Sequence, residues 1–454
     1  MSEPDTYRAH LRATLGLGLP LVGSHLAQFA VQLTDAVMLG WYGVEALAAE
    51  VLGGMLFFVL FIMGSGFAFA VMPMVAEAVA ADEQARVRRV TRMGMWLSVL
   101  FGLASLPLFI WSGALFVALG QAPRIAALAA DYLHIAGPAI LPALVVMVLK
   151  SYLAALERTQ MVLWVTLGAV AVNIVINYAL IFGNWGAPEM GVRGAAVASA
   201  AVHSVSLVLL AVYAARATRE HTLFQRLWRP DGEAFALVFR LGWPIGITNL
   251  AEMGLFAASS VMMGWLGAQA LAAHGIALQV ASVTFMVHLG LSNAATVRAG
   301  RALGRRDAAG LRRGAEVVLA LSGAVGLATV AVFLLVPEWL MGLFLSPDDP
   351  QRDAVVSIGV GLLAAAALFQ LADAAQVIAL GLLRGVQDTR VPMVIAALAY
   401  WAVGIPVSYV LGFGLGWGGV GVWLGLAAGL ALAGVFMLLR FRGWLARTAG
   451  RALG

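Results

Sequence analysis

The sequence contains no cysteine and few charged residues. Of its 454 residues, only 11% are Asp, Glu, Lys or Arg, whereas an ordinary soluble globular protein carries roughly 25%. Without cysteine there can be no disulfide, thiolate metal site or cysteine nucleophile. The GxSxG elbow, the HExxH pair and the GxxxxGK[ST] phosphate loop are also missing from the chain, and each would signal an enzyme or an ATP-driven pump. We therefore expect neither an enzyme nor a bound cofactor.

Long apolar runs take the place of charge. The chain is 62% hydrophobic and its mean hydropathy is +0.92. A helix of about 20 apolar residues crosses a hydrocarbon core of about 30 Å, and the lipid interior favours helices because it offers no partner to free backbone groups. We predict an all-α membrane protein with twelve spans, at residues 15–42, 46–72, 93–118, 131–155, 161–183, 192–214, 237–265, 271–296, 315–341, 355–383, 391–415 and 418–440.

Basic residues are distributed very unevenly between the loops. Of the 28 Lys and Arg, only Arg124, Arg193 and Arg352 fall in the loops on one side of the predicted spans. Cytoplasmic loops retain basic residues, so we expect both termini in the cytoplasm. This topology also accounts for the net charge of +5, and we expect the lipid bilayer rather than a nucleic acid as the partner of these residues.

An internal repeat divides the chain into two halves. LGLPLVGSHLAQFAVQLTDAVMLGWYGVEALAA, from Leu17, matches LGWPIGITNLAEMGLFAASSVMMGWLGAQALAA, from Leu241, without a gap. The same offset continues through a charged loop and pairs Gly66 with Gly290. Such duplication predicts two six-helix bundles related by a pseudo-two-fold axis along the membrane normal, with a substrate cavity between them.

The repeat sets the predicted domains and leaves a polar linker between them. We expect an N-terminal lobe over 1–214, a cytoplasmic linker over 215–236 and a C-terminal lobe over 237–454. Phe224, Leu227 and Trp228 lie in the longest polar stretch of the chain. Their spacing favours an amphipathic helix on the inner membrane surface.

Three acidic residues lie inside predicted spans, namely Asp35, Glu252 and Asp373. A charged group at mid-bilayer costs about 2.5 to 3.5 kcal/mol on insertion scales, so an acid that persists there is a functional candidate. The repeat places Asp35 opposite Ser259, so the two halves carry their acids at different positions. We interpret this divergence as specialisation. Acids near span ends, including Glu50, are predicted to be interfacial or structural.

Polar and aromatic neighbours at helical spacing extend these sites. In the first half, Asn173 and Asn177 are one turn apart and are the expected partners of Asp35. We expect no arginine or lysine at this depth, so carboxylates among amide oxygens suit a proton or sodium ion. Candidates for an adaptable cavity for flat cationic molecules are Asn249, Phe256, Met262, Gln279, Phe285, Phe369 and Gln376. Interhelical hydrogen bonding and core packing are the alternatives for these side chains.

Several motifs resemble the multidrug and toxic compound extrusion (MATE) family, in its NorM-type branch. They are TDAVMLG around Asp35, NLAEMGLF around Glu252, SNAATVRAGRALG, and DAAQVIALGLLRGVQDTRVPM from Asp373 onward. The resemblance covers nearly the whole chain. It implies a V-shaped pair of six-helix lobes, sodium- or proton-driven efflux of varied and often cationic drugs, and a bacterial inner-membrane location.

The resemblance also assigns roles to residues. It implies that Glu252 and Asp373 form the cation site of the second lobe, where Na+ would bind, and that Asp35 with Asn173 and Asn177 forms the polar site of the first. Sodium-coupled relatives often have a tyrosine one turn before the span-10 aspartate, whereas this chain has Phe369. One oxygen ligand for sodium is therefore absent at that position, and protons stay an alternative.

We predict a monomeric antiporter that exports organic, often cationic, compounds in exchange for Na+ or H+ by alternating access. Two other transporters remain as alternatives, a lipid or polysaccharide flippase of the same superfamily and a major facilitator-type transporter. A membrane receptor or scaffold that transports nothing is the alternative from a different class. In that case, neutralising the buried acids would change no phenotype.

Overall fold

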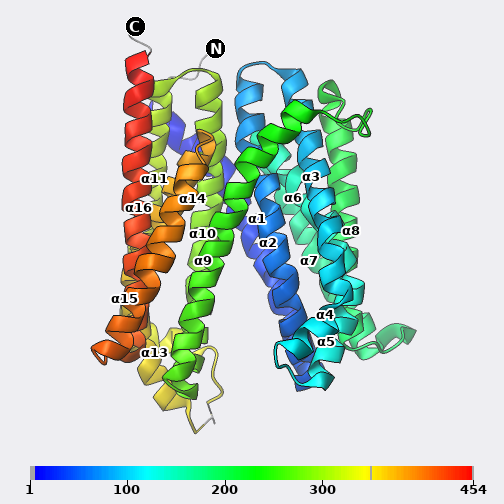
Figure 1. The fold of residues 1–454 in the computed structure, drawn as a ribbon, viewed down its shortest axis with the longest axis vertical. Coiled ribbons are helices and arrows are strands. Elements are labelled where there is room, and N and C mark those ends of the chain that lie inside the picture. The colour runs from blue at the N-terminus through cyan, green and yellow to red at the C-terminus, as the bar shows by residue number, and fades with distance from the viewer. Residues whose placement is uncertain (1–5, 348–349, 452–454) are drawn as a thin grey trace. The chain divides into compact units, whose positions relative to one another are not determined.

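The computed structural model describes residues 6–347 and 350–451, and helices make up nearly all of this part of the chain (Figure 1). Twelve helical segments among the described residues are long and apolar enough to cross a membrane. Each coincides with one of the predicted spans, so the all-α membrane class is confirmed. The α-helices are α1 (Tyr7–Tyr42), α2 (Val44–Ala80), α3 (Gln84–Ile110), α4 (Ser112–Ala118), α5 (Pro123–Ala136), α6 (Ile140–Ala155), α7 (Thr159–Phe182), α8 (Val192–Ala217), α9 (Gly232–Trp265), α10 (Ala268–Gly304), α11 (Ala308–Leu335), α12 (Pro337–Gly342), α13 (Arg352–Gly385), α14 (Arg390–Ala397), α15 (Ile405–Tyr409) and α16 (Gly418–Arg451).

Short helices of other types interrupt or connect these elements. Three are 3-10 helices, η1 (Gly137–Ala139), η2 (Asn184–Gly186) and η3 (Arg219–His221), and two are π-helices, η4 (Leu398–Gly404) and η5 (Val410–Gly414). The segment η1 joins α5 to α6 within the fourth span, which covers Pro123–Ala155. The π-helices lie within the eleventh span, where α14 leads into η4 and α15 into η5.

Two spans end earlier in the chain than expected. The segment predicted over 93–118 divides into α3 and the short α4, and the segment predicted over 315–341 divides into α11 and α12. The second break has a direct cause, because Pro337 opens α12 and proline fits the first turn of a helix better than its interior. Both breaks occur at corresponding places in the two halves.

The helix boundaries follow the sequence repeat. Helices α2 and α10 are each 37 residues long, and each begins after a glycine, Gly43 and Gly267. These glycines are separated by the same offset as Leu17 and Leu241. The starts of α3 and α11, at Gln84 and Ala308, keep this offset. The duplication is therefore present in the structure as well as in the sequence.

The chain forms two compact units. One is Gly23–Gly246, which we call the first lobe; the other combines the described part of Met1–Val22 with Ile247 onward, and we call it the second lobe. The first turns of α1 thus pack with the second half of the chain, and the first turns of α9 with the first half. The expected domains (1–214, 215–236 and 237–454) are defined by the sequence repeat, whereas these two units are defined by contacts in the structure. The expected boundaries therefore stay a prediction.

Small residues allow α10 and α13 to approach closely inside the second lobe. A Cβ on Gly381 would lie 2.3 Å from Ser292 Oγ, so only glycine fits there. Ser292 Oγ donates to the Val377 carbonyl at 2.7 Å, and Thr296 Oγ1 donates to the Gly381 carbonyl at 2.9 Å. Close backbone approach and interhelical hydrogen bonds of this kind hold helices together in lipid. The motifs SNAATVRAGRALG and DAAQVIALGLLRG therefore have a packing role.

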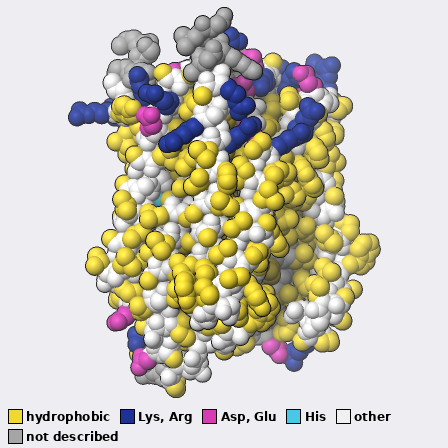
Figure 2. All heavy atoms as spheres, turned by 60° about the vertical axis from the view of Figure 1, so that its left-hand side comes forward, with side chains coloured by type: hydrophobic (Ala, Val, Ile, Leu, Met, Phe, Trp, Pro, Cys, Tyr) yellow, Lys and Arg dark blue, Asp and Glu magenta, His cyan; other side chains and the backbone are white. Residues whose placement is uncertain are grey.

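The surface matches a protein embedded in lipid. On the face drawn in Figure 2, hydrophobic side chains cover most of the length of the helices, and Lys and Arg gather mainly at one end. Large apolar side chains such as Trp164, Val208 and Leu335 are exposed, which suits contact with acyl chains rather than water. The chain ends that we expect in the cytoplasm lie outside the described residues, and their location stays a prediction.

The linker does not form the amphipathic helix that the sequence favours. After η3 it runs through turns up to α9. Its carbonyls bond to side chains of α3 instead of forming helical hydrogen bonds: Arg92 donates to Thr222 and Leu223 at 2.8 Å each, and Trp96 donates to Leu227 at 2.7 Å. These bonds hold the linker as an irregular segment against the first lobe.

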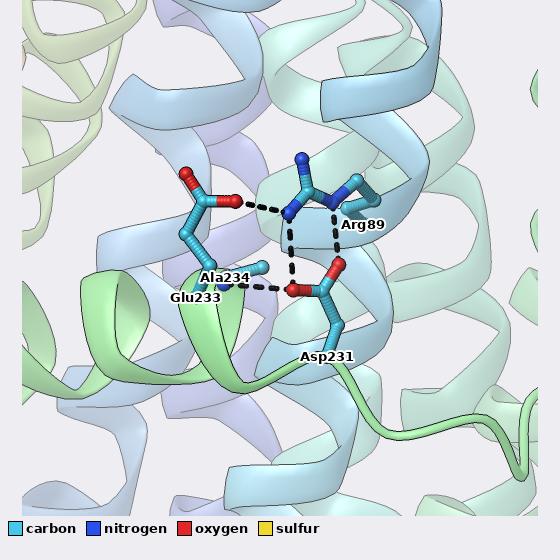
Figure 3. A network of polar contacts seen from close by, with 4 residues as sticks. All are labelled: Arg89, Asp231, Glu233 and Ala234. Carbon is cyan, nitrogen blue, oxygen red and sulfur yellow. Dashed lines mark hydrogen bonds and ion pairs between the residues drawn. The ribbon is translucent and has the colours of Figure 1, made fainter.

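An arginine of α3 also holds the start of α9 (Figure 3). The Arg89 guanidinium donates to both carboxylate oxygens of Asp231 and to Glu233. Asp231 caps the helix as well, since its Oδ1 accepts from the Ala234 backbone N–H at 3.1 Å, which is the usual N-cap bond. The hydrogen bond from Arg89 lowers the pKa of Asp231. The linker is thus attached at both ends of its turns.

Candidate functional site

The first-lobe site centres on Asp35 of α1, whose side chain is only 6% exposed. Asn173 and Asn177 share a face of α7 because they are one turn apart. Both amide groups donate to Asp35 Oδ1, at 2.8 Å from Asn173 and 2.5 Å from Asn177. Ser199 of α8 donates to Asp35 Oδ2 at 3.4 Å. The structure therefore brings together the three residues expected from the sequence and adds a serine.

The first-lobe site is rich in hydrogen-bond donors. Donors that point at a carboxylate stabilise its charged form, so the neutral groups around Asp35 offset part of the cost of burying its charge. Asn177 Nδ2 also donates to Asn173 Oδ1 at 3.2 Å. The remaining oxygen, Asn177 Oδ1, is buried and has no hydrogen-bond partner within the described residues. This site thus offers one further oxygen to a cation or a proton donor.

The second-lobe site has the opposite character. Asp373 of α13 is 1% exposed, and neither of its carboxylate oxygens has a hydrogen-bond partner in the described part of the chain. Glu252 of α9 interacts electrostatically with Asp373, and its buried Oε1 is likewise unpartnered among the described side chains. Two acids that lie close together in an apolar interior cannot both stay ionised without a positive charge.

A buried arginine lies near one of these acids, Glu252, contrary to the expectation that none is found at this depth. Arg384 is 6% exposed, donates to Asn249 Oδ1 at 2.7 Å and interacts electrostatically with Glu252. The expectation is wrong because the span was predicted to end at residue 383, whereas α13 continues to Gly385. That last turn packs tightly against α10 and encloses the guanidinium.

Buried amide and phenol groups complete the second-lobe site. Gln376, one turn after Asp373 on α13, donates to the Tyr400 hydroxyl at 2.7 Å. Tyr400 is fully buried and interacts electrostatically with both acids. It lies in the π-helix η4, an irregularity that often occurs at functional sites. The carbonyl oxygens of Gln376 and Gln370 are buried and have no partner within residues 6–347 and 350–451.

Aromatic side chains lie next to this polar group. Phe369 packs edge-on against Phe256, with ring centroids 5.9 Å apart, and against Trp423 at 5.4 Å. Trp423 Nε1 donates to His274 Nδ1 at 3.1 Å, so in the neutral imidazole the proton is on Nε2, which faces Ser260 at 3.1 Å. Phe256 and Phe369 are therefore adjacent, as cavity residues would be.

The cavity role of three further candidates stays a prediction. Gln279 is exposed on α10. Met262 is 3% exposed and belongs to the hydrophobic core of the second lobe. Phe285 is half-buried on α10. The position of Met262 agrees with core packing, the alternative given above for these residues.

Sequence reasoning overlooked Ser199, Arg384 and Tyr400. Arg384 could have been found by extending the tenth span through the LLRG turn. Tyr400 could have been noted as a polar tip in the middle of an apolar span, because a buried tyrosine hydroxyl needs a partner. Ser199 could not have been singled out from the sequence, since serine is common in membrane helices as an interhelical hydrogen-bonding residue.

A separate cleft lies between α1, α10 and α11 of the second lobe. Its lining includes His10, Arg298, Arg305 and Asp307 and none of the three buried acids. Arg298 Nη2 and His10 Nδ1 are 2.6 Å apart. A cleft with two arginines repels cations, so we do not assign the cation site to it.

Comparisons with known proteins agree on one family. The family model MatE matches residues 20–179 and 244–410. A probable multidrug resistance protein NorM of Agrobacterium fabrum is 44% identical over 97% of this chain and 95% of its own length. Another with the same name, from Rhizobium meliloti, is 46% identical over 96% of this chain and 94% of its own length.

Solved structures agree on the fold. One described as the outward-facing conformation of a multidrug resistance MATE family transporter has a TM-score of 0.88 at 19% identity, and the match covers 97% of this chain and 96% of that one. A transporter of the MOP superfamily from Pyrococcus furiosus has a TM-score of 0.87 at 18% identity, covering 97% of each chain. At such low identity these matches establish the architecture alone.

Proposed function

The chain belongs to the multidrug and toxic compound extrusion family, a family of membrane transporters and not of enzymes, and from this membership we propose that it is an antiporter. It exports small organic molecules, often cationic, in exchange for an inward-moving Na+ or H+. The curated relatives are named as probable multidrug resistance proteins, which supports varied organic compounds as cargo. The coupling ion and the charge of the cargo are our inference from the site.

One observation carries the proposal: the second-lobe acids sit among oxygens that lack hydrogen-bond partners. Both oxygens of Asp373, Oε1 of Glu252, and the amide oxygens of Gln370 and Gln376 are buried without a partner in the described residues. An unsatisfied buried acceptor costs about 1 to 3 kcal/mol, and a charged one costs more. A proton or a hard monovalent cation removes this cost, since oxygen is the ligand that such cations prefer.

Competition for these oxygens would couple the two fluxes. A coupling ion and an organic cation both stabilise the ionised acids, so each weakens the binding of the other, and the coupling free energy is the same in both directions. Arg384 interacts with Glu252 and offsets part of the negative charge. The site therefore needs to gain about one positive charge, in agreement with exchange rather than simultaneous binding.

The identity of the ion depends on the number of oxygen ligands. Phe369 occupies the position where sodium-coupled relatives often have tyrosine, and it offers no oxygen. Tyr400 presents a hydroxyl to the same acids from η4, and Gln376 holds that hydroxyl at 2.7 Å. We infer that Tyr400 supplies the phenolic oxygen from a different helix, which keeps Na+ in competition with H+ at Glu252 and Asp373.

The cellular setting is part of the proposal. Twelve membrane-crossing helices and the family establish a multi-pass membrane protein. We propose that it works as a monomer in the bacterial inner membrane with both termini in the cytoplasm. The support is the uneven distribution of basic residues between the loops. Of the 28 Lys and Arg, only Arg124, Arg193 and Arg352 lie in the loops that this topology places outside the cytoplasm, and cytoplasmic loops retain basic residues.

Proteoliposomes with separately imposed gradients test the function. Export of an organic cation such as ethidium is measured with an inward Na+ gradient at equal pH, and with an inward H+ gradient without sodium. The wild type should respond to at least one gradient, while Asp35→Asn, Glu252→Gln and Asp373→Asn should lose export to differing extents. Asp353→Asn is the matched control, because the Asp353 side chain is fully exposed at the start of α13.

The outcomes separate the alternatives. If neither gradient moves the organic cation, antiport is refuted, and a flippase assay with labelled lipid becomes the next step. If all three acid variants export at the rate of Asp353→Asn, the buried acids are structural and the coupling mechanism is wrong.

A further inference from the structure

Glu50, which the sequence predicts to be interfacial or structural, belongs to the first lobe. It is half-buried on α2, about two turns from the start of the helix at Val44. Glu45, one turn before it, is an ordinary surface acid: its side chain is 51% exposed and pairs with Arg124 at 2.7 Å. Two acids on one helix therefore have different surroundings, and Glu50 is the one directed toward the polar interior.

Two adjacent glycines make room for Glu50 and its neighbour. A Cβ on Gly54 would lie 3.3 Å from Glu50 Oε1, so the carboxylate folds back over this glycine. A Cβ on Gly53 would lie 2.9 Å from a ring carbon of Tyr132, so the ring of this α5 residue crosses α2 at that point. Tyr132 is 6% exposed. The pair Gly53 and Gly54 thus allows a carboxylate and a phenol to lie against the same helix.

These groups connect to the site around Asp35. Glu50 interacts electrostatically with Asp35, and Tyr132 interacts with both acids and with Ser199. Ser199 in turn donates to Asp35 Oδ2 at 3.4 Å. The polar group of the first lobe therefore extends over five helices, α1, α2, α5, α7 and α8, and contains two carboxylates.

The second lobe gives independent support through the repeat. The offset that places Asp35 opposite Ser259 places Glu50 opposite His274. In the second lobe these two positions touch, because Ser259 Oγ lies 3.4 Å from His274 Nε2. Helices α2 and α10 keep the repeat offset at both ends, and α1 and α9 keep it to within one residue, so the repeat predicts that the same two positions face each other in the first lobe. There the pair consists of two acids.

We propose that Glu50 is a second carboxylate of the first-lobe site and acts with Asp35 as one two-carboxylate unit that takes up a proton or a hard monovalent cation. The buried and unpartnered Asn177 Oδ1 beside Asp35 supplies a neutral oxygen to the same cation. Tyr132 and Ser199 bridge the two acids. This inference rests on the proposed antiport function and adds a coupling residue to it.

The consequence is a division of labour along the site. Asp35 is held by three donors, at 2.8, 2.5 and 3.4 Å, which offset part of the cost of burying its charge. Glu50 has no comparable set of donors among the described residues, so a cation entering the site compensates Glu50 first. Glu50 then responds to the coupling ion, and Asp35 holds that ion in the lobe.

The test compares Glu50→Gln with the control Glu45→Gln in gradient-driven export from proteoliposomes. We expect Glu50→Gln to lower export about tenfold, within the range typical of coupling between sites, and Glu45→Gln to leave it unchanged. Glu50→Asp should recover part of the activity because it keeps the carboxylate. The double variant Asp35→Asn/Glu50→Gln should export as fast as the slower of the two single variants, since the effects of residues that act as one unit are not additive.

A second readout is independent of transport. Dicyclohexylcarbodiimide modifies protonated carboxyl groups in apolar surroundings, and mass spectrometry identifies the modified residue in the purified protein. We expect modification at Glu50 and not at Glu45, and less modification of Glu50 when Na+ is present or the pH is raised. If the wild type shows no gradient-driven export, the antiport proposal fails while this labelling still decides the state of Glu50.

Three results would overturn the inference. Equal export by Glu50→Gln and Glu45→Gln removes Glu50 from the coupling machinery. A multiplicative loss in the double variant shows that Asp35 and Glu50 act separately. Equal labelling of Glu50 and Glu45 shows that Glu50 does not share an apolar site with Asp35.

Discussion

The two lobes hold their buried acids in opposite ways. Asp35 accepts hydrogen bonds from Asn173, Asn177 and Ser199, whereas Asp373 accepts none from the described residues. Neutral donors can keep a buried carboxylate ionised without help, but an unpartnered one needs a proton or a cation. We therefore propose that the second lobe has the main coupling role and the first lobe a supporting one.

The two lobes also differ in the partner of a basic residue. In the first lobe Lys150, the only lysine, reaches Gln28 at 3.4 Å. In the second lobe Arg384 faces Glu252, the residue that the repeat places opposite Gln28. The charge of Lys150 is therefore not balanced by its amide partner, whereas the charge of Arg384 is balanced by a carboxylate. The same scaffold therefore has a positive group at a similar place in both lobes and a counter-charge in only one.

The largest effect should follow from removing the unpartnered acid. We expect Asp373→Asn to reduce gradient-driven export to the level of protein-free liposomes, because Asp373 is the acid of this site whose two oxygens both lack a partner among the described residues. Asp35→Asn should retain measurable export, lower by about 5- to 10-fold, which is at the weak end of coupling free energies. The ratio of the two rates, measured side by side, checks the order. The reverse order would invert the assignment of the two lobes.

A smaller effect on activity, but a large one on stability, should follow from removing the arginine. Arg384→Gln leaves Glu252 without its counter-charge, and breaking a buried pair from one side typically costs about 3 to 5 kcal/mol. The variant should unfold at a lower temperature in detergent, and Arg384→Lys should recover part of the loss. Thermal unfolding of the matched first-lobe variant Lys150→Gln is the comparison. An equal loss in both lobes would mean that the counter-charge does not distinguish them.

The contact that positions Asp373 should be sensitive to a single methyl group. At Gly381 a Cβ would lie 2.3 Å from Ser292 Oγ and 2.6 Å from the Ser292 carbonyl, while at Gly323 nothing lies within 4 Å. We expect Gly381→Ala to cost about 1 to 3 kcal/mol through overpacking. Gly323→Ala should be neutral or slightly stabilising, since alanine favours a helix by about 0.5 to 1 kcal/mol. The unfolding curves of the two variants measure the change in stability. Competition of Na+ or H+ with a bound organic cation measures whether the Asp373 site is also changed.

The smallest effect concerns the linker, which is bound to the first lobe. The Tyr152 hydroxyl donates to Thr218, so His221 Nδ1 donates to the hydroxyl oxygen of Tyr152. Burial lowers the pKa of His221 below its usual value of 6.5. The released linker therefore binds a proton more readily than the docked one, so docking is strongest above pH 6.5 and weakens as the pH falls from there toward the lowered pKa.

Hydrogen exchange of residues 218–230 measures this docking. Exchange should be faster at pH 5.5 than at pH 7.5 after correction for the intrinsic rate, and His221→Gln should abolish the difference. A linker whose protection is the same at both pH values, or is higher at the lower pH, would contradict the role of His221.

Much of this architecture can be predicted from sequence because its causes are local. Apolar runs must be helices in lipid, and the repeat fixes the register that gives α2 and α10 the same length. The contact between Asp35 and the two asparagines follows from their helical spacing and from the presence of few other polar groups. Hydropathy does not reveal that α13 continues past residue 383 to bury Arg384, because an arginine in a turn-like motif normally ends a span.

Other features depend on tertiary contacts that leave little trace in a single sequence. Tyr400 reaches the acids through a π-helix, and the linker is held by arginines of α3 rather than by its own amphipathic pattern. Gln279 and Met262 have suitable chemistry for a cavity, but Gln279 is exposed on α10 and Met262 is buried in the core of the second lobe. The residue types are readable from the sequence, and the direction of each side chain requires the fold.

Binding competition at the second-lobe site tests the central claim most directly. Equilibrium binding of the fluorescent organic cation ethidium is measured for the purified wild type and for Glu252→Gln/Asp373→Asn, while Na+ is titrated at fixed pH and pH is varied without Na+. We expect Na+ or H+ to displace the probe from the wild type, and neither to change its residual binding to the double variant. Equal displacement from both proteins would show that the two acids do not form the coupling site.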